Sequence, residues 1–242
     1  MSGPELGLAI SVFLACAVEA VEALTIVLAV GTTRSWRSAM YGVGAATVAL
    51  AAVVAALGPA LTAIPIDSLR LVVGGLLIVF GLQWLRKAVL RAAGLKALHD
   101  EEQTFAEESA AALAAGEAPK GIDGYSFAIS FKGVLLEGLE VAFIVVTFGA
   151  NQHRVGLAAA AAGVAIAAVV LAGVLAKAPL ARVPENAMKF VVGVMLTSFG
   201  TFWGAEGAGA SWPGGDAALL VIIPALAVAS LSMVGWLKAA PA

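Results

Sequence analysis

The sequence predicts an all-α integral membrane protein with seven transmembrane helices, arranged as two inverted three-helix repeats plus one extra helix. Three observations support this fold: a very apolar composition, long apolar runs, and motifs that occur in both halves. Hydrophobic residues make up 61% of the 242 residues, charged residues make up 12%, and the mean hydropathy is +0.99. In a soluble domain the apolar fraction is nearer one half. The composition therefore indicates a chain that spans a membrane, and we expect the plasma (inner) membrane.

Long apolar runs give the expected helices in order. A helix needs about 20 apolar residues to cross a hydrocarbon core about 30 Å thick. Seven runs meet this requirement, namely residues 5–30, 39–63, 68–90, 127–149, 155–177, 187–206 and 216–238. The first run has no basic residue ahead of it and contains two glutamates, so we expect a retained span and not a cleaved signal peptide.

Two motifs recur at nearly equal offsets and indicate an internal repeat. The string EAVE at residues 19–22 matches EGLE at residues 137–140, at an offset of 118. The string LRLVVG at residues 69–74 matches MKFVVG at residues 188–193, at an offset of 119. Because each repeat holds three spans, the second repeat must enter the membrane from the opposite face, as in many secondary transporters.

The repeats define the expected domain organisation. It consists of a first three-helix repeat (1–90), a cytoplasmic acidic linker (91–126), a second inverted three-helix repeat (127–206) and a seventh transmembrane helix (207–242). We interpret the linker as a solvated helix followed by a flexible stretch. The alternative is a metal-sensing site that includes His99 and Glu102, which no tight ligand spacing supports.

The distribution of basic residues predicts the orientation. If the N-terminus is outside, twelve of the fourteen Lys and Arg residues fall on or near the cytoplasmic face, and only Arg70 and Arg154 fall outside. Cytoplasmic loops carry an excess of Lys and Arg. We therefore expect the N-terminus outside and the C-terminus in the cytoplasm.

Four glutamates in the middle of apolar runs are the candidate metal ligands. Glu19 and Glu22 are three residues apart, as are Glu137 and Glu140, so each pair shares one helix face. No Lys or Arg lies within four residues of either pair, so protons or a metal ion must balance the charge. Inverted symmetry predicts Glu140 outermost, Glu19 and Glu137 side by side at the midplane, and Glu22 innermost. Carboxylate oxygens suit hard cations, and metal entry should displace protons.

Other residues are weaker candidates. The glutamates themselves have a structural alternative, as protonated side chains that hydrogen-bond between helices, but this would require the same accident in both repeats. The hydroxyls of Thr25, Thr197 and Ser198 can offer oxygens to an ion, although Ser and Thr in such helices mostly bond their own backbone. Trp84 and Trp203 are expected in the interfacial aromatic belt.

The EGLE string at residues 137–140, its partner at 19–22, the seven spans and the orientation together resemble the high-affinity iron permeases of the iron/lead transporter family, within the lysine-exporter superfamily. That family carries Arg-Glu-Gly-Leu-Glu in its first and fourth helices. The resemblance implies that Glu19, Glu22, Glu137 and Glu140 bind a metal cation on the permeation path. Val18 and Leu136 replace the family's arginine, which changes the charge of the site by one unit per repeat and favours a divalent ion or proton exchange.

The predicted function is secondary transport of a metal cation, iron-like first and manganese or calcium second, with proton coupling. We expect the metal ion to be the substrate and membrane lipid to surround the protein. We expect no organic cofactor and no nucleic acid, and the sequence is compatible with a homo-oligomer. Two alternatives stay open: a manganese or calcium cation–proton exchanger, and a permease subunit that depends on a redox partner. We do not expect an enzyme, because intramembrane metal hydrolases usually add a His or a second nucleophile near the metal.

Overall fold

The computed structural model describes residues 3–62, 65–97, 101–176 and 185–239, and within these ranges the chain is helical with no strand. It divides into two compact units. Unit 1 comprises Met1–Pro59 and Asp100–Val183, and unit 2 comprises Ala60–His99 and Pro184–Ala242. Each unit therefore combines segments from both halves of the chain, and its limits differ from those of the predicted repeats.

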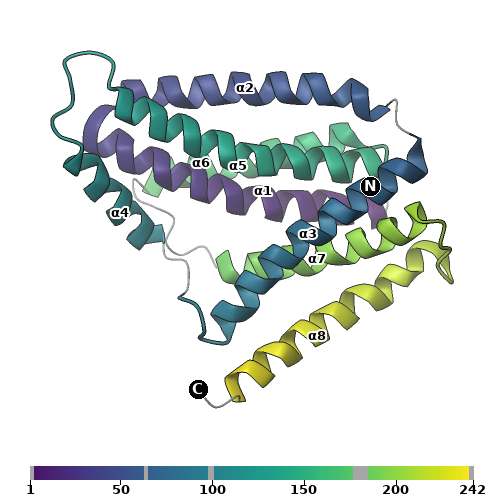
Figure 1. Ribbon diagram of the computed structural model, residues 1–242. Coiled ribbons are helices and arrows are strands. Elements are labelled where there is room, and N and C mark those ends of the chain that lie inside the picture. Colours follow the sequence, from purple (N-terminus) through teal and green to yellow (C-terminus); the bar gives the residue numbers. More distant parts are fainter. Residues whose placement is uncertain (1–2, 63–64, 98–100, 177–184, 240–242) are drawn as a thin grey trace. The chain divides into compact units, whose positions relative to one another are not determined.

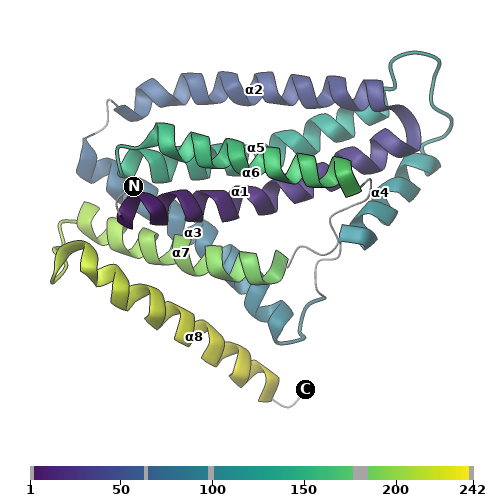
Figure 2. The ribbon, with the colours of Figure 1, turned by 180° about the vertical axis from the view of Figure 1, so that it is seen from behind.

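Six continuous helical stretches in the described residues are long and apolar enough to cross a membrane. The longest, Glu5–Ala56, has 52 residues and joins α1 (Gly3–Val30), the π-helical η1 (Gly31–Ser35) and α2 (Trp36–Thr62). At 1.5 Å per residue it would extend about 78 Å if straight, more than twice a hydrocarbon core. The chain instead reverses direction at η1, as Figures 1 and 2 show.

Local chemistry explains the break at η1. The hydroxyl of Thr32 donates to the carbonyl of Leu28 at 2.7 Å, and Thr33 donates to the carbonyl of Ala29. Such side-chain bonds compete with the regular backbone ladder and bend helices. Gly31 leaves room for the ring of Trp36, because a Cβ at Gly31 would lie 2.7 Å from Trp36 Cε3.

In unit 1, α1 runs antiparallel to α5 (Gly124–Asn151). At one end of the pair Arg34 Nε lies 2.8 Å from Asp123 Oδ2, and at the other Arg154 Nη2 lies 3.0 Å from Glu5 Oε1. Between these ends, a Cβ at Gly133 of α5 would lie 3.0 Å from the side chain of Ile26 in α1. The two helices that carry the glutamate pairs thus lie side by side over most of their length.

The other helices of unit 1 surround this pair. α2 runs parallel to α5, with Gly42 against Ser130 and Leu50 against Gly138, and the two helices lie side by side in both ribbon views. α6 (Val155–Ala176) packs against α1 and α5, and α4 (Glu101–Ala114) packs against α1. Helix α5 is therefore enclosed by α1, α2 and α6.

Unit 2 contains α3 (Ile66–Ala92), α7 (Glu185–Gly207), the short 3-10 helix η2 (Gly215–Ala218) and α8 (Leu219–Ala239). Helices α3 and α7 are antiparallel and pack through glycines: the backbones of Gly74 and Gly204 touch, and a Cβ at Gly193 would lie 2.9 Å from Leu85 N. Small residues allow this close approach of membrane helices. Helix α8 packs against both α3 and α7.

The two tryptophans expected in the aromatic belt are buried inside unit 2. Trp84 is 4% exposed and Trp203 is 6% exposed. The Lys189 Nζ lies 5.8 Å from the centroid of the Trp84 ring, and Trp203 stacks on Phe199. The prediction was wrong for both residues because helix packing, which the motif alone does not reveal, turns them inward.

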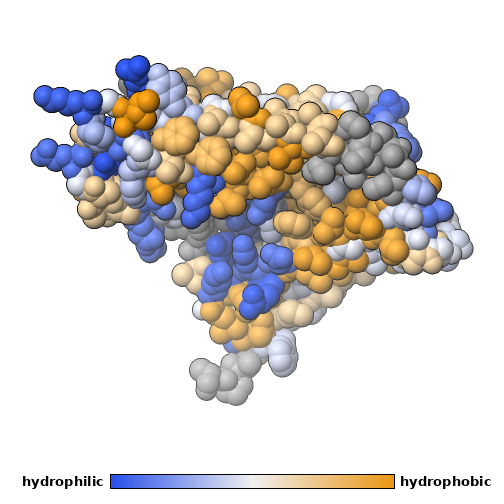
Figure 3. Space-filling view, turned by 45° about the horizontal axis from the view of Figure 1, so that its top comes forward, coloured by the Kyte–Doolittle hydropathy of each residue, from blue (hydrophilic) through white to orange (hydrophobic). Residues whose placement is uncertain are grey.

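The surface fits a membrane environment. Many large apolar side chains are exposed, among them Leu220, Val221 and Trp236 on α8, each at least 70% exposed. Apolar side chains also cover much of the face in Figure 3. In water such a surface would be costly. The described helices are therefore those of an all-helical protein compatible with membrane insertion.

Candidate metal site

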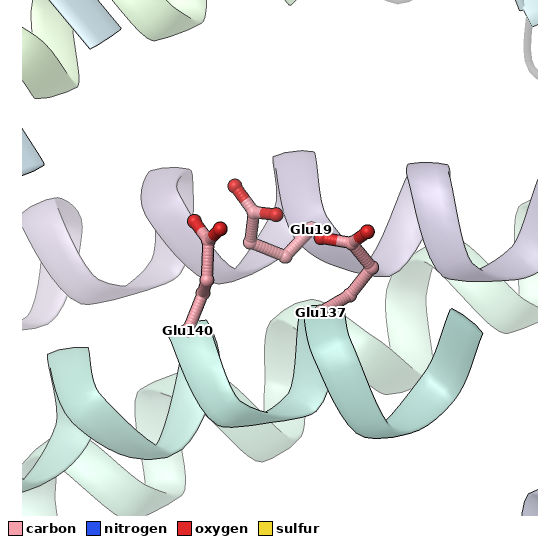
Figure 4. Close-up of side chains that lie close together, drawn as sticks. All are labelled: Glu19, Glu137 and Glu140. Atoms are coloured by element: carbon pink, nitrogen blue, oxygen red, sulfur yellow. The ribbon is translucent and has the colours of Figure 1, made fainter. Parts of the chain in front are cut away.

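Three glutamates of unit 1 meet at the contact between α1 and α5. Ligand oxygens from Glu19, Glu137 and Glu140 all lie within 4.8 Å of one another. Glu137 and Glu140 extend from α5 toward α1, and the Glu19 carboxylate lies between theirs in the view of Figure 4. The Glu19 side chain is buried, with 2% of the residue exposed, whereas Glu137 and Glu140 are half-buried.

The helical spacing and the antiparallel packing create this group. Glu137 and Glu140 are one turn apart on α5 and project from the same face, and Glu19 enters from the neighbouring helix. Gly138 lies between them in sequence and contacts Leu50 of α2 closely. A Cβ at residue 138 would clash with the side chain of Leu50, so the glycine of the EGLE string lets Leu50 pack against α5 beside the carboxylates.

Glu22 lies outside the group. It is half-buried on α1, one turn beyond Glu19, and its oxygens do not join the three that lie within 4.8 Å. The structure therefore brings together three of the four predicted ligands.

The spacing of the three carboxylates suits one hard cation. Metal–oxygen bonds to such ions are about 2.0 to 2.6 Å long, so oxygens on opposite sides of one ion lie about 4 to 5 Å apart. Three carboxylates this close cannot all stay ionised in a low-dielectric interior without a cation or protons. The group can therefore exchange protons for a metal ion.

The weaker candidates do not join this group. The hydroxyl of Thr197 donates to the carbonyl of Gly193 at 2.8 Å, and that of Ser198 donates to the carbonyl of Val194 at 2.7 Å. Both bond their own helix, as predicted. Thr25 is buried on α1. Glu102 is exposed on α4, and His99 lies outside the described residues.

The sequence analysis missed a polar cluster in unit 1 formed by Arg34, Asp123 and Ser126. It treated Arg34 only as an orientation charge. The available signal was an Asp at a helix start with a Ser three residues later, a capping pattern. Asp123 does cap α5, and its side chain accepts a hydrogen bond from Ser126 N.

No family model, curated protein or solved structure matches this chain.

Proposed function

We propose that this protein is a secondary transporter of a metal cation, coupled to protons, and not an enzyme. The observation that carries the proposal is the group formed by Glu19, Glu137 and Glu140, whose oxygens lie within 4.8 Å of one another. The group lies midway along two apolar helices. Acidic residues at such a position are costly and usually serve an ion or proton path.

We also propose that the chain is built from two inverted three-helix repeats plus a seventh span. Inverted repeats require equivalent helices to run in opposite directions. The equivalent helices α1 and α5 are antiparallel, and so are α3 and α7. The contacts of unit 2 support the symmetry: Gly74 touches Gly204, and Leu85 touches Gly193. Residue 193 is residue 74 plus the repeat offset of 119, and residue 85 is residue 204 minus the same offset. The offset therefore converts the Gly74–Gly204 contact into the Gly193–Leu85 contact, as a two-fold axis requires.

The ends of unit 1 support the same symmetry. The acidic partners of the two ion pairs, Asp123 and Glu5, are 118 residues apart, which is the offset of the glutamate motifs. The two pairs lie at opposite ends of the α1–α5 contact. We count α1 and α2 as separate spans because the chain reverses at η1, which gives seven.

The donor set favours a hard cation as substrate. All three side chains offer carboxylate oxygens, and such ligands suit manganese, calcium, magnesium or ferric iron better than soft ions. Iron is our first candidate and manganese or calcium the second. Glu22, one turn from Glu19, is proposed as a neighbouring position that the ion or its proton occupies during passage.

The proposal is tested by metal flux into liposomes that contain the purified protein. We expect flux of iron or manganese with an opposing proton movement. Glu19→Gln and Glu137→Gln should abolish both, whereas Glu107→Gln on the exposed acidic face of α4 is the matched control and should not. Undiminished flux and unchanged pH dependence in Glu19→Gln and Glu137→Gln would refute the mechanism.

The orientation is part of the proposal. We place the N-terminus outside the plasma (inner) membrane, which puts Arg34 near the cytoplasm and Arg154 outside. Labelling single cysteines beside these residues from each side of sealed vesicles tests this. A reagent that reaches the Arg34 side only from outside would reverse the orientation.

A further inference from the structure

The end of unit 1 that contains Arg34 is tied together by that one side chain. Arg34 lies in η1 with a side chain only 5% exposed. Its Nε and Nη2 donate to the two carboxylate oxygens of Asp123 at 2.8 and 3.0 Å. Its Nη1 donates to the carbonyls of Ala112 at 2.8 Å and Gly116 at 2.6 Å. Arg34 thus joins η1, the end of α4 and the start of α5.

Packing holds α4 on this end as well. Ala112 of α4 is fully buried and forms a core cluster with Val30 and Ala39, against which Tyr125 and Ile129 pack. The Arg34 guanidinium also lies over the Tyr125 ring, 5.2 Å from its centroid. The linker expected from the sequence to be a solvated helix therefore covers one end of the α1–α5 pair.

A line of polar residues leads from this end toward the glutamates. Ser130 and Glu137 are seven residues apart on α5, so they lie on one helix face, about 10 Å apart along the axis. Asp123, seven residues before Ser130, caps the start of the same helix. Asp123 and Ser130 are both buried, at 2% and 0% exposure.

Among the described residues, the buried hydroxyls of Ser130 on α5 and Ser109 on α4 have no hydrogen-bond partner. By contrast, Ser11, Thr147, Thr197 and Ser198 each donate to a backbone carbonyl. Buried polar groups are normally satisfied, and an exception calls for a water or an ion. Ser130 lies at a close contact with α2, because a Cβ at Gly42 would lie 3.1 Å from Ser130 Cβ and 2.4 Å from Phe127 O.

The opposite end of unit 1 is held more weakly. Its ion pair joins Glu5 to Arg154, and the Arg154 side chain is 60% exposed. Exposed single pairs contribute little stability. A buried, bidentate arginine that also binds two carbonyls is a far stronger closure. The two ends that inverted symmetry relates are therefore closed to different degrees.

We propose that Arg34, Asp123 and α4 form a closed gate at one end of a polar path that runs along α5 from the glutamates through Ser130. Opening requires Arg34 to release Asp123 and the carbonyls of α4, so that α4 moves off the start of α5. Ser130 then offers its hydroxyl to the ion or to its hydration water between Glu137 and the exit. This inference rests on the proposed function, because the path is a transport path only if the glutamates bind the cargo.

The test measures access to residue 130. Ser130→Cys is placed in a Cys16→Ala background, and the protein in lipid nanodiscs is treated with a charged thiol reagent that reaches both membrane faces. We expect slow labelling with the gate intact. Arg34→Lys keeps the charge but loses the planar fork, and it should speed labelling by at least about tenfold, the change that a loss of about 1.4 kcal/mol produces in an equilibrium. Arg154→Lys, at the other end, is the matched control and should leave the rate unchanged.

A second variant guards against a folding defect. Asp123→Asn keeps the size of the side chain and a capping oxygen, and it should also speed labelling. In both gate variants, amide hydrogen exchange of α4 should rise while that of α6 stays the same. Fast labelling before any gate substitution, or no change in labelling and exchange in Arg34→Lys and Asp123→Asn, would overturn the gate.

Access does not depend on metal flux, so the two proposals fail separately. If the gate variants label as expected but Glu19→Gln leaves flux unchanged, the closure stands and the transport mechanism fails. If Glu19→Gln abolishes flux but Arg34→Lys leaves the labelling rate of residue 130 unchanged, the gate is refuted and the metal site stands.

Discussion

Units 1 and 2 each contain a pair of antiparallel helices taken from corresponding positions in the two halves of the chain, yet the pairs meet through different chemistry. In unit 1, α1 meets α5 through side chains: Ile26 lies over Gly133, and Glu19 reaches two carboxylates. In unit 2, α3 meets α7 backbone to backbone, as at Gly74 and Gly204. The first contact has polar groups that can hold an ion, whereas the second leaves no space for one.

The difference indicates a division of labour. Backbone contact between helices resists small displacements, because close-packed protein interiors have low compressibility. A contact made by carboxylates depends on what neutralises them and so responds to protons and metal. We therefore interpret unit 2 as the rigid part and the α1–α5 contact as the responsive part.

The largest expected effect comes from removing a direct ligand in unit 1. Glu19→Gln should weaken metal binding by more than the 10- to 100-fold that loss of an outer-shell partner costs, because it removes one of three carboxylates. Its thermal midpoint should not fall, since the substitution also removes like-charge repulsion. Isothermal titration with Mn²⁺ and a thermal unfolding series measure the two quantities. A fall in stability with binding intact would reverse the roles assigned to the units.

A substitution in unit 2 should have the opposite effect, lowering stability without changing metal affinity. Gly200→Val should reduce stability by about 1 to 3 kcal/mol, the usual cost of overpacking, because a Cβ there would lie 2.7 Å from Ile78 N. Gly163→Ala on α6, where nothing lies within 4 Å of a Cβ, is the control and should leave stability nearly unchanged. Metal affinity of the folded fraction should stay the same in both variants.

A smaller effect on metal affinity is expected for Glu22, the fourth glutamate, than for Glu140. Glu140→Gln should weaken metal affinity by at least about tenfold, whereas Glu22→Gln should weaken equilibrium affinity only a few-fold, because Glu22 lies outside the group of three. If Glu22 serves passage, its substitution slows flux more than it weakens binding. Equal losses of affinity in the two variants would show that four carboxylates bind the ion together.

The smallest effect concerns pH at the Arg34 end. The hydrogen bonds from Arg34 hold the pKa of the Asp123 carboxyl well below its ordinary value, and Ser126 contributes further. A carboxyl whose pKa is lowered by folding stabilises the protein above its unfolded pKa, about 3.9, and this contribution is lost as pH falls further. The difference in thermal midpoint between the natural protein and Asp123→Asn should therefore be constant from pH 5 to 8 and shrink below about pH 4. A difference that changes between pH 5 and 8 would contradict this account.

Much of the fold followed from the sequence for a simple reason. Apolar runs of about 20 residues determine where membrane helices form, and α3, α5, α6, α7 and α8 begin and end within a few residues of the predicted runs. The three-residue spacing of the glutamates and their repeat offset also predicted that α1 and α5 carry one acidic site. These signals are local in the chain, so they can be read without knowing which helices touch.

The contacts between helices could not be predicted in the same way. The motif contains four equivalent glutamates, but packing brings only Glu19, Glu137 and Glu140 together. Trp84 and Trp203 were expected at the lipid surface and are buried. The linker gave no sign that Ala112 and Gly116 accept hydrogen bonds from Arg34, because backbone carbonyls have no sequence signature.

The sequence by itself thus determined an all-helical, apolar chain with acidic residues at repeat-equivalent positions, because hydrophobicity and helical periodicity are properties of short segments. Only the tertiary structure decided which carboxylates converge, which glycines bring two backbones into contact, and that α4 covers one end of the α1–α5 pair. Those outcomes depend on the side chains of distant segments fitting one another, and neither composition nor spacing along a single helix contains that information.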